Sequence, residues 1–515
     1  MACTIVALLC VFQPILASPT VQPDPALDAV VAQITAGPTY PPPTRTVDRR
    51  DLLSDAASYA NSLLDGAPSF ITDGVANFFQ GFPTGEAVLK SAGISSTDLD
   101  AVPTQALNIP GYGNWTTAGW NLRVHGNIFK QPNISDDKIN DLANVFLIDT
   151  SVQELPPSQL AQAVNLTRSI YVVQQGEENV TVDIGPAPSA GTNGEPGGGG
   201  GVTPPGGSQQ VTLPYPTTDQ GDFDVFVPLS DQGLEDGNTT GPPQKINVYV
   251  NGTEAGNATS YLVATEGLTI ISDIDDILRV TKIYVPKEGL LNSFARPFTQ
   301  WMNMPDIYAN WSTALPDTHF HYLTTTPEQV TRNYMDFIYK TYPGGSFDTR
   351  PLNFSDVSAT LSIRRFLLDK IFLTYPKRKF VLVADTSNSD VMKAYPAMAQ
   401  DYPGQVQCIF LRNTSATDEE NRFPYDTSGF EGLNQQMYMF FRVPDDLTNL
   451  DISNGQCYNA SIPQNVTFGY QGLPFGIGES RKGAAPRLVA VSENRLGLSL
   501  GVVLAFMGAV ALFGS

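Results

Sequence analysis

Three aspartates interrupt an apolar stretch of the sequence, EGLTIISDIDDILRVTKIY, which runs from Glu266 to Tyr284. The aliphatic residues before them are typical of a buried β-strand, so the aspartates are expected just beyond its end. Asp273 and Asp275 are two residues apart in an extended segment and would lie on the same side of the chain, whereas Asp276 would lie on the other side. Two carboxylates in this position can act as nucleophile and general acid–base, or as ligands of a hard cation.

Two later strand-like segments also end in polar side chains. Thr324 to Thr326 end the segment HFHYLTTT, and Asp385 and Asp390 frame the loop that follows KFVLVAD. Each motif alone would more often be a turn or a helix cap. Helical patterns separate the strands, and this alternation predicts a parallel sheet covered by helices. Because the carboxyl ends of parallel strands meet at one edge, we expect the acids and hydroxyls to converge there.

A cluster of carboxylates and hydroxyl groups indicates a particular chemistry. Gathered carboxylates repel one another unless a cation compensates them, and Mg²⁺ prefers oxygen ligands of this kind. Hydroxyl groups on a neighbouring loop are suited to bind a phosphate oxygen. The pattern therefore predicts a magnesium-dependent phosphoryl-transfer site.

Three segments carry a resemblance to a known family: SDIDDILRVT, HYLTTTPEQV and YPKRKFVLVADTSNSDVMKAYPAMAQDYPGQVQCIFLRN. In order and spacing they resemble the catalytic region of the actin-patch phosphatidate phosphatases, from Glu266 to Asn413. That family belongs to the haloacid dehalogenase-like superfamily, whose members use an Asp nucleophile and Mg²⁺. The resemblance implies an α/β catalytic domain of that type, a Mg²⁺ cofactor, and a phosphatidate-like lipid or small phosphate monoester as substrate. The segment GWNLRVHGNIF is similar, more weakly, to the β region that precedes the catalytic domain in the family.

The resemblance also implies roles for the four acids. Asp273 would attack phosphorus and form an aspartyl-phosphate. Asp275 would protonate the leaving alkoxide and then activate water. Asp385 and Asp390 stand where the late metal-binding acids of the family stand, and together with Asp273 and Asp275 they would bind Mg²⁺.

The phosphate-binding residues are less closely matched. Thr324 begins the hydroxyl motif, and the phosphate-neutralising Lys of the family falls on Arg364, or on Arg365 if the register shifts. Ile277 replaces a threonine of the family's D-I-D-D-T motif, and ADTSN replaces G-D-S-G. All four carboxylates remain, which favours a working phosphatase. The alternative is a catalytically inactive cell-surface binding protein on the same fold.

Composition excludes several other functions. The chain of 515 residues has 51 acidic and 30 basic residues and a formal charge of -21, which argues against nucleic acid as a partner. It contains three histidines and no G-x-S-x-G sequence, so an α/β-type serine hydrolase lacks its nucleophile motif.

Both ends of the chain carry features of the secretory pathway. Residues 1–17 predict a signal peptide. Residues 483–515 predict a GPI-anchor signal, with Gly483 or Ser492 as attachment site, or alternatively a membrane helix. The protein would then be tethered to a membrane at the cell surface or wall. Twelve N-x-S/T sequons support glycosylation; they are at Asn114, Asn133, Asn165, Asn179, Asn238, Asn251, Asn257, Asn310, Asn353, Asn413, Asn459 and Asn465.

The remaining sequence predicts the domain organisation. Residues 18–105 form a Pro/Ala-rich leader with short helices, and 106–265 form a small antiparallel β domain with a disordered Gly/Pro loop at 185–210. Residues 266–425 form the catalytic domain and 426–482 a C-terminal extension. Cys408 and Cys457 would form a disulfide closing a loop of about fifty residues, or remain as two buried thiols.

Overall fold

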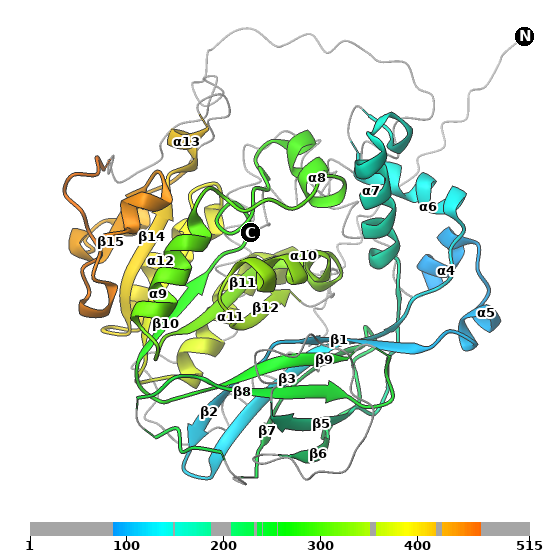
Figure 1. Ribbon diagram of the computed structural model, residues 1–515, viewed down its shortest axis with the longest axis horizontal. Coiled ribbons are helices and arrows are strands. Elements are labelled where there is room, and N and C mark those ends of the chain that lie inside the picture. The colour runs from blue at the N-terminus through cyan, green and yellow to red at the C-terminus, as the bar shows by residue number, and fades with distance from the viewer. Residues whose placement is uncertain are drawn as a thin grey trace, which may run out of the picture.

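A computed structural model of the chain describes residues 86–464, apart from 148–149, 187–207, 231–233, 239, 255, 351–356 and 419–424. Two β-sheets, here named sheet A and sheet B, form the body of the molecule (Figure 1). The predicted signal peptide, most of the leader and the C-terminal anchor signal lie outside the described residues. Two short helices, α4 (Glu86–Ala92) and α5 (Ser96–Asp100), precede sheet A.

Sheet A corresponds to the predicted β domain and has nine strands. Its order is β1-β3-β2-β9-β8-β5-β6, with β4 and β7 also paired to β3. All of its pairs are antiparallel except β2 with β9. Side chains in β7 alternate between buried and half-exposed, as expected for a sheet with one face against a core. The strands are β1 (Thr104–Ile109), β2 (Tyr112–Thr116), β3 (Gly119–Lys130), β4 (Val173–Gln174), β5 (Thr181–Pro186), β6 (Gln209–Thr212), β7 (Asp222–Pro228), β8 (Gln244–Val250) and β9 (Asn257–Val263).

Two helices interrupt the β domain between β3 and β4, and the sequence analysis did not predict them. They are α6 (Asp136–Ala143) and α7 (Pro157–Ile170). A proline occupies the first turn of α7, where its missing N–H costs no helical hydrogen bond. Ala163, Thr167 and Ile170 bury one face of α7 at helical spacing.

Sheet B is entirely parallel, with the order β12-β11-β10-β13-β14-β15. Every residue of the central strand β10 is buried, which explains its continuous aliphatic sequence. β12 was not predicted from the sequence. β15 lies in the predicted C-terminal extension, so the boundary predicted at residue 425 falls inside the sheet. The strands are β10 (Leu268–Ser272), β11 (His319–Pro327), β12 (Ser346–Arg350), β13 (Lys379–Asp385), β14 (Val406–Arg412) and β15 (Tyr438–Phe441).

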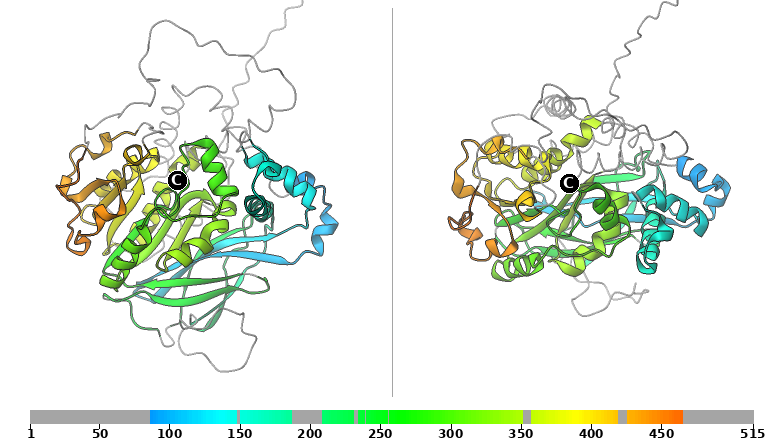
Figure 2. Two further views of the ribbon diagram at one scale, coloured as in Figure 1. Left: turned by 45° about the horizontal axis from the view of Figure 1, so that its top comes forward. Right: turned by 90° about the horizontal axis from the view of Figure 1, so that it is seen from above.

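Helices cover both faces of sheet B, as predicted (Figure 2). On one face Ile270 and Val383 pack with α9 and α10. On the other face Ile271 and Leu382 pack with α11 and α12. The parallel sheet and its two helical layers confirm an α/β fold. The helices that follow α7 are α8 (Pro286–Phe294), α9 (Met304–Ala314), α10 (Glu328–Thr341), α11 (Val357–Thr374), α12 (Ser389–Asp401) and α13 (Thr414–Thr417). Short 3-10 helices occupy Asn144–Phe146, Val152–Glu154, Ser428–Phe430, Gln435–Met437, Pro444–Leu447 and Ile452–Asn454.

A buried network of charges joins the two sheets, and we call it the interdomain cluster: Arg123, Asp224, His321, Asp348 and Lys370. From β3, Arg123 donates two hydrogen bonds to Asp224, at 2.7 and 2.8 Å, and one to Asp348 in β12, at 2.6 Å. Lys370 of α11 contacts Asp224 at 2.7 Å, and His321 of β11 contacts Asp348 at 2.9 Å. Docking of sheet A on sheet B therefore depends on matched charges as well as on apolar packing.

The structure contains a disulfide between Cys408 of β14 and Cys457, the pair identified in the sequence. It attaches the segment after β15 to the core of sheet B. None of the helices within the described residues combines the length and the apolar character needed to cross a bilayer.

The sequons differ in their exposure. Asn114 is 8% exposed, and its Nδ2 donates to the carbonyl of Thr374 at 3.3 Å. A glycan on this nitrogen is incompatible with that packing, which corrects the prediction for Asn114. Asn413 and Asn459 are half-buried, and Asn353 and Asn465 lie outside the described residues. The exposed sequons are Asn133, Asn165, Asn179, Asn238, Asn251, Asn257 and Asn310.

Candidate active site

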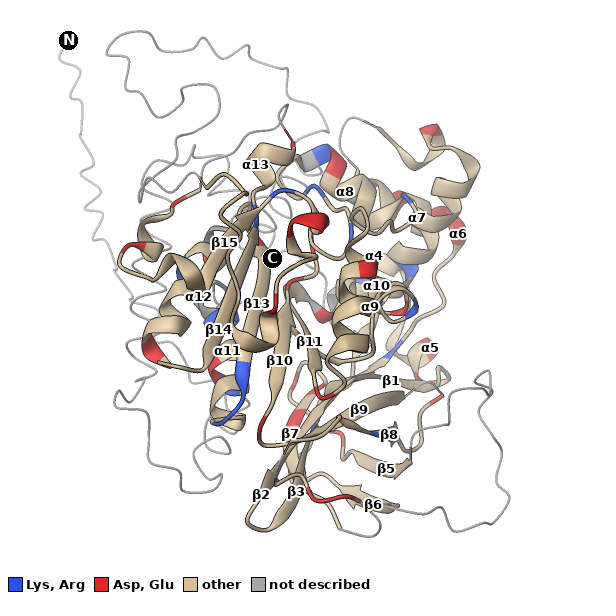
Figure 3. Cartoon of the chain, turned by 60° about the vertical axis from the view of Figure 1, so that its left-hand side comes forward, with Lys and Arg blue, Asp and Glu red and all other residues tan. Residues whose placement is uncertain are grey.

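The candidate residues on β10, β11 and β13 lie at or near the ends of these neighbouring strands of sheet B. Figure 3 shows the three strands side by side, with acidic residues in red. Asp273 follows β10, Asp385 is the last residue of β13, and Thr324 to Thr326 lie near the end of β11. The N–H of Asp273 donates to the carbonyl of Val383 at 2.8 Å, so the pairing of the two central strands continues to the nucleophile candidate. The parallel register thus positions side chains that are far apart in the sequence.

Arg364 lies between two of the predicted acids. Its Nη2 is 3.2 Å from Oδ2 of Asp273, and its Nε donates to Oδ2 of Asp390 at 3.1 Å. The guanidinium is fully buried, and among the described residues neither Nη1 nor Nη2 has an aligned hydrogen-bond partner. Arg365 instead pairs with Asp369 on the same helix, so Arg364 is the arginine at this edge.

Asp273 is fully buried, and its negative charge is only partly compensated by neighbouring groups. Burial raises its pKa to about 6, although Arg364 lowers it and Asp275 adds to the rise. Its Oδ1 accepts the N–H of Ile274 at 2.9 Å. Its Oδ2 has no aligned hydrogen bond within the described part of the chain. This oxygen and the two terminal guanidinium nitrogens of Arg364 therefore retain hydrogen-bonding capacity that the described residues do not use.

Asp275 is held by neighbours from its own loop and from β11. Its Oδ1 accepts from Arg279, with Nη2 at 2.7 Å, and from the hydroxyl of Thr281 at 2.8 Å. Its Oδ2 accepts from the hydroxyl of Thr326 at 3.2 Å. The guanidinium of Arg279 in turn lies 4.1 Å from the centre of the Tyr334 ring. These contacts fix the orientation of Asp275 beside Asp273, as a general acid–base requires.

Asp276 closes the loop that follows the site and does not belong to the catalytic pair. Its carboxylate accepts the N–H groups of Thr281, Lys282 and Ile283, at 3.1, 2.8 and 3.3 Å. Its φ is 60°, in the left-handed region that Asp tolerates better than most residues. The alternation of side chains in an extended segment had already placed Asp276 apart from Asp273 and Asp275.

Asp385 carries a second uncompensated carboxylate oxygen. Its Oδ1 accepts the N–H and the hydroxyl of Ser387, both at 2.6 Å, whereas its Oδ2 is buried without a hydrogen-bond partner in the described structure. Burial, together with the charges of Asp276 and Asp273, raises the pKa of Asp385 to about 8. The negative charge of Asp273 therefore contributes to disfavouring ionisation of Asp385.

The structure does not gather all four predicted metal ligands. Within the described residues, no group of three or more His, Cys, Asp or Glu side chains is arranged to hold a metal ion. Asp275 pairs with Arg279, and Arg364 pairs with both Asp273 and Asp390. Within the described residues, Asp273 and Asp385 each have one buried carboxylate oxygen without an aligned hydrogen bond, and a hard divalent cation takes oxygen ligands of this kind. The four-residue ligand set stays a prediction, and these two oxygens are its most available members.

The hydroxyl motif also differs from the prediction. Thr324 is fully buried, and its hydroxyl accepts the N–H of Thr326 at 3.1 Å. It is Thr326, two residues on, whose hydroxyl reaches Asp275. Ile277, which replaces a threonine of the related family, packs in the core between sheet B and α9. The hydroxyl absent at this position is therefore replaced by apolar packing.

Two cations at the site were missed by the sequence analysis. Arg279 follows Asp275 by four residues, a spacing that could have suggested a pair. Arg412 ends β14 and donates to the carbonyl oxygen of Asp276. Its position at a strand end was a usable signal, since functional residues of parallel sheets gather there.

Comparison with known proteins finds one matching family and one related protein. Residues 268–413 match the family described as "Phosphatidate phosphatase APP1, catalytic domain". The chain is also 27% identical, over 185 residues, to Phosphatidate phosphatase APP1 of Saccharomyces cerevisiae. That alignment covers 33% of this chain and 31% of the yeast protein, so the chain matches about a third of the relative's length.

Proposed function

Because residues 268–413 belong to the phosphatidate phosphatase APP1 catalytic-domain family, we propose that this protein is a phosphatase that hydrolyses phosphatidate or a related phosphate monoester. One observation carries the proposal beyond family membership. Asp273, the nucleophile candidate, has a buried carboxylate oxygen with no aligned hydrogen bond to the described residues, and the guanidinium of Arg364 lies 3.2 Å from it. A phosphoryl group next to both would meet a nucleophile and a cation at once.

The reaction we propose has two steps. In the first, a carboxylate oxygen of Asp273 attacks phosphorus, the bond from phosphorus to the alkoxy oxygen breaks, and Asp275 gives its proton to the leaving alcohol. In the second, Asp275 takes a proton from water, the water oxygen attacks the aspartyl-phosphate, and the Asp273 carboxylate is released with inorganic phosphate. Arg364 compensates the phosphoryl charge in both steps.

The pair Asp273 and Asp385 supports the proposal of a divalent cation, and we propose Mg²⁺. Both are fully buried acids with raised pKa values and an unpartnered oxygen within the described structure. A bound cation would neutralise charge on the phosphoryl oxygens. Arg279 leaves Asp275 less available for such an ion, whereas Arg364 is shared by Asp273 and Asp390.

Chelation tests the proposal directly. Purified protein is expected to release phosphate from phosphatidate and from an aryl phosphate, to lose this activity in EDTA, and to regain it when Mg²⁺ is added. Protein heated before the assay provides the background rate. Release that is absent, or that continues unchanged in EDTA, would contradict the proposal. Absent release from folded protein would favour the inactive binding protein.

We also propose that the protein passes through the secretory pathway and is held at the cell surface or wall by its C-terminal segment. The support is the predicted signal peptide, the predicted anchor signal and the seven exposed sequons. A phospholipase that cleaves phosphoinositol is expected to release the protein from intact cells. Retention after treatment, with release of a known GPI-anchored protein as control, would favour a membrane helix instead.

A further inference from the structure

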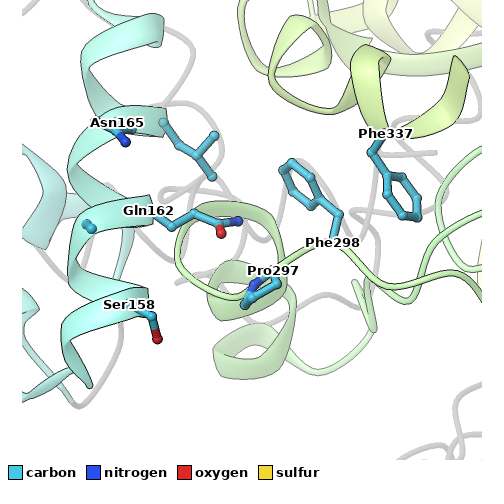
Figure 4. A pocket seen from close by; sticks show the side chains of 8 residues that line it. Ser158, Gln162, Asn165, Pro297, Phe298 and Phe337 are labelled. Carbon is cyan, nitrogen blue, oxygen red and sulfur yellow. The ribbon is translucent and has the colours of Figure 1, made fainter. Parts of the chain in front are cut away.

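An apolar groove of about 530 Å³ lies between α7 and the segment that follows α8 (Figure 4). We call it the α7 groove. One wall comes from α7, and the other comes from Pro297, Phe298 and Phe337, which face α7 across the groove. None of its eight described lining residues is charged. They are Ser158, Ala161, Gln162, Asn165, Leu166, Pro297, Phe298 and Phe337.

The groove reaches the candidate active site through two contacts. The ring of Phe298 lies 5.4 Å from the guanidinium carbon of Arg279, and Arg279 Nη2 is 2.7 Å from Oδ1 of Asp275. Phe298 also lies 6.0 Å from Phe337, measured between ring centres. Contacts through Phe298 and the buried Arg279 therefore link the lining of the groove to the acid–base candidate.

The proposed role of Asp275 as general acid determines which part of a substrate faces the groove. In the proposed reaction Asp275 protonates the leaving alcohol, so the leaving group lies on the side of Asp275. The phosphoryl group lies on the side of Asp273 and Arg364. What extends beyond the leaving oxygen would then pass Arg279 and meet Phe298.

We propose that the α7 groove binds an acyl chain of the substrate, an inference that rests on the proposed function. The chemistry of the walls favours hydrocarbon over a sugar or another polar leaving group. Leu166, Phe298 and Phe337 offer apolar surface, and the amide of Gln162 donates to the carbonyl of Arg296 at 2.6 Å. A polar alcohol would find few hydrogen-bond partners against the aromatic side of the groove, whereas burying the methylene groups of an acyl chain there is favourable.

One competing occupant belongs to the chain itself. Asn165 lines the groove, is exposed, and is the acceptor of a sequon. A glycan attached there would lie over the same apolar wall and exclude an acyl chain. The experiment therefore needs a variant at this position.

Filling the groove tests the proposal. Ala161 is exposed on α7, so Ala161→Trp should fold normally while occupying the space. We expect kcat/KM for a long-chain phosphatidate to fall on the order of tenfold, with the value for an aryl phosphate within about twofold of the original. Ala161→Ser and Lys340→Trp are the matched controls, because the first leaves the groove open and the second adds the same ring at an exposed position of α10. Equal losses for both substrates, or no loss for either, would overturn the proposal.

A binding measurement separates failure of this inference from failure of the proposed function. A long-chain alkylphosphonate, which cannot be hydrolysed, should bind the original protein at least about tenfold more tightly than it binds the Ala161→Trp variant. Methylphosphonate should bind the two proteins equally. If the protein hydrolyses nothing but shows this difference, the groove assignment stands and the phosphatase proposal fails. If it hydrolyses phosphatidate without the difference, the groove assignment fails. Long-chain binding that appears only in Asn165→Gln would assign the groove to the glycan and overturn the proposal.

Discussion

Asp273→Asn is expected to lower phosphate release by at least about 10³-fold, because the substitution removes the nucleophile. The amide keeps the shape of the side chain, and its oxygen can still accept the N–H of Ile274. The fold should therefore survive. Stability of the metal-free protein should not decrease, since a buried acid whose pKa is raised to about 6 is replaced by a neutral group.

The measurement is the initial rate of Mg²⁺-dependent phosphate release from phosphatidate, together with the thermal midpoint of each protein. Asp306→Asn is the matched control, because it makes the same chemical change at an exposed position of α9. When the original protein is quenched with acid during turnover, phosphate should be found covalently attached to Asp273. Activity of Asp273→Asn close to that of the original would exclude this residue as the nucleophile.

The location of the site was predictable because it depends on topology. Alternating strand and helix patterns predicted a parallel sheet, and such a sheet brings its strand ends to one edge. Asp273 and Asp385 follow neighbouring strands, so their approach required no knowledge of side-chain packing. β12 was missed because SFDTR, from Ser346 to Arg350, contains two charged residues, although all five are buried. The charge of Asp348 is compensated by a tertiary partner, Arg123.

The partners of each acid were less predictable. All four acids were treated as equivalent metal ligands, but Arg279 and Arg364 pair with three of them and leave Asp385 without an arginine partner among these two. Which carboxylate is neutralised depends on the direction of a long arginine side chain, and residue spacing does not encode that direction. Likewise, α6 and α7 lie where a run of strands was expected. Residues at helical spacing were present in the sequence, as Ala163, Thr167 and Ile170 of α7 show, but the strand-like segments on either side outweighed them in the prediction.

The role of Arg123 in joining the two sheets leads to the second large effect, a loss of stability in Arg123→Met. Methionine preserves much of the apolar volume but leaves Asp224 and Asp348 without their shared cation. Breaking a buried ion pair on one side typically costs about 3–5 kcal/mol, because an uncompensated charge remains buried. We expect the urea midpoint of unfolding to fall by a corresponding amount. Lys340→Met removes an exposed pair with Asp336 and should change the free energy of unfolding by less than about 1 kcal/mol.

Two further variants distinguish this mechanism from lost packing. Arg123→Lys keeps a charge without the forked geometry and should cost less than Arg123→Met. Arg123→Met combined with Asp348→Asn should be more stable than the sum of the single changes predicts, since the second change removes a charge that the first leaves unpaired.

The pH dependence gives an independent test of the interdomain cluster. Burial raises the pKa of Asp348, but Arg123 and His321 outweigh it and hold the pKa well below its usual range. Asp348 therefore contributes stability that is fully present above its unfolded pKa of about 3.9 and is lost as the pH falls from there toward the folded value. The loss of unfolding free energy at low pH should therefore be smaller in Arg123→Met than in the original protein.

The urea measurement at neutral pH could contradict the role of the cluster. If Arg123→Met unfolds at the same urea concentration as the original, the interdomain cluster does not hold the sheets together. The alignment of β11 and β12 beside the site must then come from apolar packing alone.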